Sequence, residues 1–179
     1  MNSKPGAFME SVDTDKRSIG REGFRIEEVT EATPALVANL IEIDLQTFSE
    51  STFSEYAAAA MLRNGRVFLL FSGESIIGTC VTMRCWDRPQ EAMLLSMGIK
   101  PGWRGQGLGQ QFVKDVLEKL KQRGLRSACL YVGTDNRRAI SVYKDVGFES
   151  IEIGPSGAYG SELMLMRVTL QKDPPVVML

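Results

Sequence analysis

Hydrophobic and polar residues along the chain follow two spacings, one typical of strands and one typical of helices. Short apolar runs, several of them alternating with polar residues, predict strands at residues 24–29, 66–71, 76–84, 92–99, 127–132, 149–153 and 162–170. Apolar residues three and four positions apart predict helices that begin at Pro34, Ser54, Leu108 and Asp135 or Asn136. Thr33 before Pro34 is a helix-start signature, and glycines follow the later helices.

The predicted elements come in the order strand, two helices, three strands, helix, strand, helix and two strands. This order predicts an α/β (α+β) fold around one mixed sheet that is mostly antiparallel on one side. A length of 179 residues fits one domain. We place that domain at residues 23–170, between a flexible leader at 1–22 and a tail at 171–179.

The composition of the chain excludes several binding partners and several kinds of catalytic and structural site. The 21 basic and 22 acidic residues leave a net charge of −1, so neither nucleic acid nor an anionic membrane surface is an expected partner. The chain has no histidine, which excludes Ser-His-Asp and Cys-His catalysis. The 3 cysteines show no Cys-x-x-Cys spacing, so we expect small core residues, no structural zinc and no disulfide framework. No apolar stretch reaches membrane-spanning length, and we predict a cytoplasmic protein.

The stretch Pro101–Gly109 lies where a predicted strand passes into a predicted helix. The first turn of a helix has N–H groups without an intrahelical partner, and its macrodipole places partial positive charge there. Glycines at such a junction let a ligand approach the backbone closely. The stretch therefore predicts a site for a phosphate or a pyrophosphate.

Two common phosphate motifs do not fit this stretch. Gly102 and Gly107 have the Walker A spacing, but Leu108 follows where that motif requires lysine. Gly105 and Gly107 begin a dinucleotide-binding pattern, but Gln110 stands in place of its third glycine. A nucleotide binder of another fold, which would bind ATP or NAD, is therefore disfavoured.

The residues that do match are Arg104, Gly107 and Gly109, in an Arg-x-x-Gly-x-Gly motif. With this motif the chain resembles the GNAT superfamily of acyl-CoA-dependent N-acyltransferases. The second signature of the family is present at 136–148, where an asparagine, an alanine, a tyrosine and a final Gly-Phe are in place. The overall layout is most similar to bacterial N-terminal acetyltransferases of ribosomal proteins. The resemblance implies a mixed, mostly antiparallel sheet of about seven strands flanked by four helices.

The resemblance also implies a site for acetyl-CoA, with no metal. The backbone of Met97, Gly98 and Ile99, on a strand that splays from its neighbour in the family, is expected to bind pantetheine and the acetyl carbonyl. Tyr143 is expected to protonate the departing thiolate, as an alternative to being a core tyrosine. Asn136 is expected to cap a helix, and direct contact of Asn136 with the cofactor stays an open alternative. The full set of expected cofactor contacts is Met97, Gly98, Ile99, Arg104, Gly105, Gln106, Gly107, Leu108, Gly109, Gln110, Asn136 and Tyr143.

The general base stays open. The ribosomal-protein enzymes have a glutamate five residues before the motif asparagine, and Tyr131 occupies that position here. Glu91, Glu162 or water are the alternatives. Asp44, Glu50 and Glu55 give the segment around the first two helices an acidic character that suits a cationic amine, although a solvated helix face explains them equally well.

The expected function is transfer of an acetyl group from acetyl-CoA to a primary amine, on a peptide N-terminus or a small molecule, by direct attack in a ternary complex. The loop at 154–160 is long enough to belong to an acceptor site. Tyr131 in place of the glutamate motivates one alternative, a catalytically weak CoA-binding regulatory domain. A homodimer stays open as well.

Overall fold

The computed structural model describes residues 23–171, except 30, 32, 49–53 and 155–161. Its helices are α1 (Pro34–Phe48), α2 (Glu55–Asn64), α3 (Leu108–Gln122) and α4 (Arg137–Asp145), with a short 3₁₀ turn η1 (Pro101–Trp103). Its strands are β1 (Phe24–Val29), β2 (Arg66–Ser72), β3 (Ser75–Arg84), β4 (Glu91–Ile99), β5 (Ser127–Gly133), β6 (Glu149–Ile153) and β7 (Leu163–Thr169). The predicted leader, Glu50, all of the predicted loop at 154–160 except Gly154, and residues 172–179 of the predicted tail lie outside the described residues.

The strands form one 7-stranded sheet in the order β1-β2-β3-β4-β5-β7-β6. β4 and β5 are parallel, and every other neighbouring pair is antiparallel. The predicted mixed sheet with four flanking helices is therefore confirmed. Among the described helices, none is long and apolar enough to cross a membrane.

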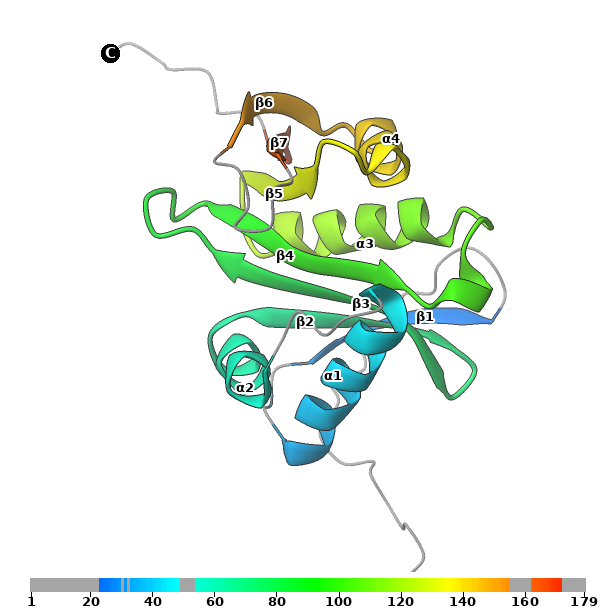
Figure 1. Cartoon of the computed structure of the whole chain (residues 1–179). Helices are drawn as coiled ribbons and strands as arrows, with labels where there is room; N and C mark the ends of the chain where they lie inside the picture. Colours follow the sequence, from blue (N-terminus) through cyan, green and yellow to red (C-terminus); the bar gives the residue numbers. More distant parts are fainter. Residues whose placement is uncertain (1–22, 30, 32, 49–53, 155–161, 172–179) are drawn as a thin grey trace, which may run out of the picture.

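Helices cover both faces of the sheet. Figure 1 shows α1 and α2 on one side and α3 and α4 on the other. The alternation along β2 explains this arrangement, because successive residues of a strand point to opposite faces. Val67 and Leu69 are buried in the cluster with α1 and α2, whereas Phe68 and Leu70 are buried in the larger cluster with α3. Two separate cores thus hold the sheet between two layers of helix.

Local sequence explains where the helices begin. The Thr33 hydroxyl accepts a hydrogen bond from the Leu36 N–H at 3.2 Å, and the Ser54 hydroxyl accepts one from the Ala57 N–H at 3.2 Å. Such caps satisfy donors that the first helical turn leaves unpaired, and each stabilises its helix by about 1 kcal/mol. The Thr33-Pro34 start and the Ser54 start were both predicted from the sequence.

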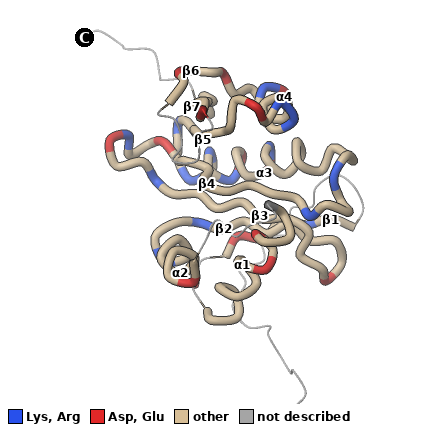
Figure 2. The backbone as a smooth tube through the Cα atoms, viewed as in Figure 1, with Lys and Arg blue, Asp and Glu red and all other residues tan. Residues whose placement is uncertain are grey.

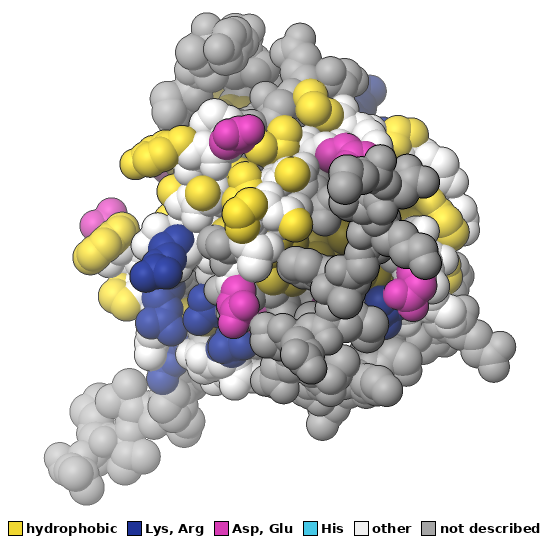
Figure 3. Space-filling model, turned by 90° about the horizontal axis from the view of Figure 1, so that it is seen from below, with side chains coloured by type: hydrophobic (Ala, Val, Ile, Leu, Met, Phe, Trp, Pro, Cys, Tyr) yellow, Lys and Arg dark blue, Asp and Glu magenta, His cyan; other side chains and the backbone are white. Residues whose placement is uncertain are grey.

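Charged side chains are dispersed over the molecule. Figure 2 shows acidic and basic residues on both sides of the sheet, in keeping with the net charge of −1. Figure 3 looks onto the face formed by α1 and α2, where hydrophobic side chains are exposed and Lys and Arg gather toward one edge. Leu45 of α1 and Tyr56 of α2 are among the exposed large apolar residues.

Candidate functional site

The site begins where β4 and β5 separate. Among the described residues, the two strands pair from Glu91 with Ser127 to Leu94 with Leu130, and the pairing goes no further. β4 nevertheless continues to Ile99, and its other edge stays paired with β3 up to Ile99. The last residues of β4 therefore turn one backbone edge toward the gap between the strands, where N–H and C=O groups are available to a ligand.

A bulge at Leu95 changes which way the end of β4 faces. Val81 of β3 pairs with Ser96 and Thr82 pairs with Leu94, so Leu95 is an extra residue in the ladder. Leu94 is buried on the side of α3, whereas the Ser96 hydroxyl lies 3.5 Å from the Asp44 carboxylate of α1. Two residues that would share a face in a regular strand thus point to opposite faces.

A glycine in β3 allows the backbone at the end of β4 to lie close. A methyl group added at Gly78 would lie 2.7 Å from Cδ1 of Ile99 and 2.9 Å from the Gly98 carbonyl oxygen. The Lys100 N–H then donates to the Ile77 carbonyl at 2.9 Å. These contacts hold the Met97–Ile99 backbone firmly against β3 while its other edge stays open.

The Gly-rich stretch follows as η1 and the start of α3. Gly107 is the N-cap of α3 with a positive φ of 76°. The Arg104 guanidinium donates to two backbone carbonyls, from Nε to Ile99 at 2.7 Å and from Nη2 to Thr47 at 2.6 Å. Arg104 therefore joins the end of α1, the end of β4 and the loop, and it retains three N–H donors for an anion.

α4 forms the opposite wall. The Asn136 side-chain oxygen accepts a hydrogen bond from the Ala139 N–H at 3.1 Å, so the asparagine is the predicted cap and its amide nitrogen stays available. The Tyr143 ring packs edge-on against Phe148, with ring centroids 5.6 Å apart. Burial, with a smaller effect from the Cys80 thiol, raises the pKa of Tyr143 above that of an ordinary phenol. Tyr143 therefore keeps its proton at any physiological pH.

These elements enclose a cavity of about 440 Å³. Ten of the residues expected from the sequence line it, namely Met97, Gly98, Ile99, Arg104, Gly105, Gly107, Gly109, Gln110, Asn136 and Tyr143. Gln106 and Leu108 are not in its lining, and Leu108 is a core residue, so any contact from Leu108 comes from its backbone. The lining also includes Thr47, Arg138, Ala139, Val142 and Asp145, which sequence reasoning did not select.

The cavity residues that sequence reasoning did not select differ in whether a sequence signal could have identified them. Arg138, Ala139 and Val142 lie on α4 one helical turn or less from Asn136 or Tyr143, so helical spacing could have identified them. Thr47 lies on α1 and has no local signal, since it reaches the cavity through a contact with a residue 57 positions away.

Glu91, one of the three alternatives for the general base, does not fit that role on geometric grounds. Its side chain is only 3% exposed, and Oε1 accepts hydrogen bonds from Arg167 Nε at 2.6 Å and from the Ser127 hydroxyl at 2.8 Å. Burial alone would raise the pKa of Glu91, but these hydrogen bonds outweigh it and the pKa is lowered. Glu91 also opens β4, at the end opposite Ile99, about 25 Å along the strand.

The other acidic and phenolic candidates lie in different places. Glu162 is exposed beside β7, and its carbonyl accepts the Thr134 N–H at 2.9 Å, just beyond the end of β5. Tyr131 of β5 is 43% exposed. Asp44 is buried at 1% exposure, so it is not part of a solvated helix face, whereas Glu55 is exposed in the first turn of α2.

A second cavity of about 640 Å³ lies elsewhere, between β2, β3 and the end of α3. It is basic, but Arg66 and Arg123 in its wall pair with Glu28 at 3.2 Å and 2.7 Å. It contains neither the glycine-rich loop nor the open edge of β4. The cavity beside Tyr143, although smaller, is the candidate site.

The geometry agrees with what is found among known proteins. The sequence pattern of the acetyltransferase (GNAT) family matches residues 34–148. A mycothiol acetyltransferase of Streptomyces scabiei is 36% identical over 85 residues, which are 48% of this chain and 27% of that protein. The chain thus spans little more than a quarter of that relative.

Solved structures share the fold. The ribosomal-protein-S18-alanine N-acetyltransferase of Escherichia coli superposes with a TM-score of 0.75 at 19% identity, over 87% of this chain and 99% of that one. An acetyltransferase of Bacillus subtilis in complex with CoA gives a TM-score of 0.67 at 21% identity, over 83% and 99% of the two chains.

Proposed function

The chain belongs to the acetyltransferase (GNAT) family, and we propose that it transfers the acetyl group of acetyl-CoA to a primary amine in a ternary complex. The observation that carries the proposal is the cavity between the open edge of β4, the glycine-rich loop and Tyr143. An anion site, an unpaired strand edge and a protonated phenol are the three features that a CoA thioester and its leaving group require.

The loop accounts for the cofactor anchor. Backbone N–H groups in the first turn of α3, at Gly107 to Gly109, would bind the pyrophosphate. Arg104 would add charged donors beside the loop, and Arg138 on α4 would do so from the opposite wall, where Figure 2 shows basic residues on α4.

The open edge of β4 accounts for the reacting end. Pantetheine would pair with the backbone of Met97 to Ile99 as an added strand does, and a β4 N–H would donate to the thioester carbonyl. The amine nitrogen attacks that carbonyl carbon, the C–N bond forms and the C–S bond breaks. The thiolate takes up a proton from the Tyr143 hydroxyl. The amine loses a proton to water, and a proton from water returns to Tyr143.

The acceptor is proposed as a class. The solved relative from Escherichia coli is described as acting on an alanine of a ribosomal protein, and the Streptomyces scabiei relative is named a mycothiol acetyltransferase. The two names differ in the acceptor they imply. We propose a primary amine on a peptide N-terminus or a small molecule, which enters between the ends of β4 and β5 beside Thr47.

An amine panel tests the proposal. The protein is incubated with acetyl-CoA and peptides, amino acids or aminoglycosides, while free CoA thiol is followed and acetylated products are identified by mass. Thiol release that depends on a particular amine supports transfer. Tight CoA binding without thiol release from any amine would instead support the regulatory binding domain.

Gly107 provides a test of the anchor. Its φ of 76° costs an L-residue about 1–2 kcal/mol, so in Gly107→Ala the free loop should relax out of this conformation. CoA binding must then restore it, and the affinity should fall about tenfold, as measured by calorimetry. A methyl group at Gly107 meets no atom within 4 Å, so the effect would come from the backbone. Gly102→Ala in the same loop is the matched control, because Gly102 has no positive φ and an equally open surrounding. Equal affinities in the two variants would contradict the anchor.

The pH profile tests the acid and the base together. Tyr131 stands where the ribosomal-protein enzymes have a glutamate, so no carboxylate base is expected at this position. kcat/KM should therefore rise with pH through the pKa of the acceptor amine, about 8 for an α-amino group. Because burial raises the pKa of Tyr143, ionisation of the phenol should not lower the rate below about pH 10. Acceptors of lower pKa should shift the rise to lower pH. A rise that stays at one pH for every acceptor would indicate a general base on the protein instead.

A further inference from the structure

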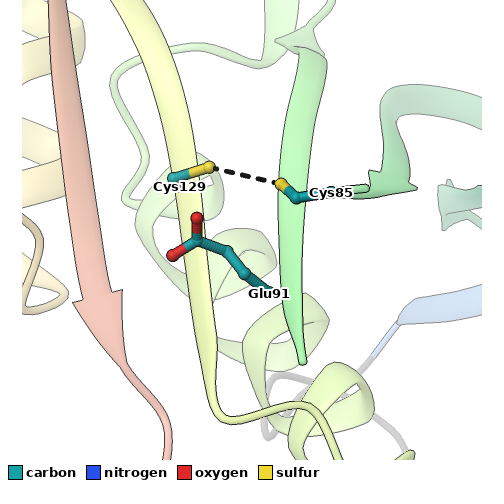
Figure 4. A group of neighbouring side chains, drawn as sticks. All are labelled: Cys85, Glu91 and Cys129. Carbon is teal, nitrogen blue, oxygen red and sulfur yellow. Dashed lines mark hydrogen bonds between the residues drawn. The ribbon is translucent and has the colours of Figure 1, made fainter. Parts of the chain in front are cut away.

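Two thiols and a carboxylate converge at the end of the sheet remote from the cavity. Cys85 follows β3, Glu91 opens β4 and Cys129 lies in β5, so three separate segments supply the group. Figure 4 shows the two sulfur atoms pointing toward each other with the Glu91 carboxylate beside Cys129. The Cys85 N–H donates to the Glu91 carbonyl at 3.0 Å, which fixes the loop residue against β4.

The distances suit a shared metal better than a disulfide. The sulfur atoms of Cys85 and Cys129 are 3.9 Å apart, and the three ligand atoms all lie within 4.8 Å of one another. Two thiolates bound tetrahedrally to Zn²⁺ at 2.3 Å each have sulfur atoms about 3.8 Å apart. A disulfide requires about 2.05 Å, so at least one of the two side chains would have to move to form one.

Arg167 makes the charges of such a site balance. It donates to Glu91 from Nε to Oε1 at 2.6 Å and from Nη2 to Oε2 at 3.3 Å. A divalent cation with two thiolates and one carboxylate has a net charge of about −1, and the guanidinium beside it cancels that charge. Arg167 and Ser127 would also hold the carboxylate in place, as outer groups commonly do for metal ligands.

Solvent can reach the group from one side. Cys129 and Glu91 are buried, but Cys85 is half-buried and residues 86–90 after it are exposed. This side offers an entry path and room for a water molecule as fourth ligand.

We propose that Cys85, Glu91 and Cys129 form a binding site for a thiophilic divalent cation, with Zn²⁺ as the cellular ion. Binding forms two metal–sulfur bonds and one metal–oxygen bond, and it releases two thiol protons to solvent without any oxidation. Because each thiol must lose its proton to bind the cation, affinity should increase with pH. The site lies at the far end of β4 from Ile99, so it would brace the sheet and not take part in acyl transfer.

Cobalt is the probe for the test. The purified, reduced chain is freed of metal, titrated with Co²⁺ at pH 7.5 and followed by thiolate-to-cobalt charge transfer and by the visible bands of tetrahedral cobalt. Saturation at one Co²⁺ per chain, reversed by Zn²⁺, is expected. At 100 times Kd, Zn²⁺ should raise Tm by about 5–10 °C.

Variants decide whether these residues are the ligands. Cys85→Ser, at the half-buried position, should weaken cobalt binding at least about 100-fold and abolish the rise in Tm. Cys80→Ala is the matched control, because Cys80 is a buried cysteine outside the cluster and its loss should leave the cobalt spectrum unchanged. Circular dichroism establishes that each variant is folded. No charge-transfer band in the wild type, or an equal band in Cys85→Ser, would overturn the proposal, whatever the outcome of the acetyltransferase assay.

Discussion

Replacing Tyr143 by phenylalanine is expected to lower kcat by about 10²–10³-fold while leaving the Kd for CoA within about twofold. The substitution keeps the ring that packs against Phe148 and removes only the hydroxyl of this cavity-lining residue. Steady-state kinetics with saturating acetyl-CoA, together with calorimetry of CoA binding, separates the two quantities.

The physical reason lies in the leaving group. A CoA thiolate is unstable in a cavity that offers it no hydrogen-bond donor. Tyr143, which carries a phenol hydroxyl, is among the residues that line the cavity. Because burial raises the pKa of Tyr143, complete proton transfer from the phenol is uphill. The hydroxyl would therefore act first as a hydrogen-bond donor to the forming thiolate, with the proton replaced from water as it moves.

Tyr56→Phe is the matched control for this variant. Tyr56 is 85% exposed on α2, so loss of its hydroxyl should change neither kcat nor CoA affinity by more than about twofold. If Tyr143→Phe behaved like Tyr56→Phe, water would be the proton source and Tyr143 a core residue only.

Arg167→Met is expected to lower the free energy of unfolding by about 3–5 kcal/mol at pH 7. Glu91 is 3% exposed, and the variant would leave its carboxylate with the Ser127 hydroxyl but without the guanidinium that neutralises it. Urea denaturation in the presence of a chelator, monitored by circular dichroism, measures the difference without any contribution from bound metal.

Arg123→Met provides the comparison. Arg123 pairs with Glu28 at 2.7 Å, but its side chain is 45% exposed, so this substitution should cost less than about 1 kcal/mol. Similar losses of unfolding free energy in both variants would mean that burial does not increase the contribution of the Glu91–Arg167 pair to stability.

The pH dependence of the same variants has a definite sign. The folded pKa of Glu91 is lowered, so its pairing contributes stability that is fully present above the unfolded pKa of about 4.3 and is lost as the pH falls through the folded value. The gap in stability between wild type and Arg167→Met should therefore narrow below about pH 4.

Local signals in the sequence predicted the fold well. Thr33 and Ser54 cap the helices that they were expected to cap, and the spacing of apolar residues indicated each strand of the sheet within a few residues. The glycine-rich loop and the asparagine-to-tyrosine segment were also recognisable, because each motif is contiguous. Their roles toward CoA stay predictions.

Contacts between distant segments were not predictable. Nothing near Leu95 signals a bulge, since neither glycine nor proline is adjacent to it in β4. Glu91 was an incorrect base candidate because its partner Arg167 lies 76 residues away. The cysteines were expected to be small core residues, and Cys80 and Cys129 are buried, but no local signal shows that the sheet brings Cys85 and Cys129 together across 44 residues. The bulge, the ion pair and the approach of the two cysteines all depend on packing between distant segments, which a single sequence does not reveal.

The most direct test of the account is the position of CoA in a crystal structure of the complex. We predict that the pyrophosphate lies at the N–H groups of Gly107 to Gly109, that pantetheine pairs with Met97 to Ile99, and that the sulfur lies within hydrogen-bond reach of the Tyr143 hydroxyl. CoA bound in the arginine-lined cavity beside Arg66 and Arg84, or a CoA sulfur remote from Tyr143, would contradict it.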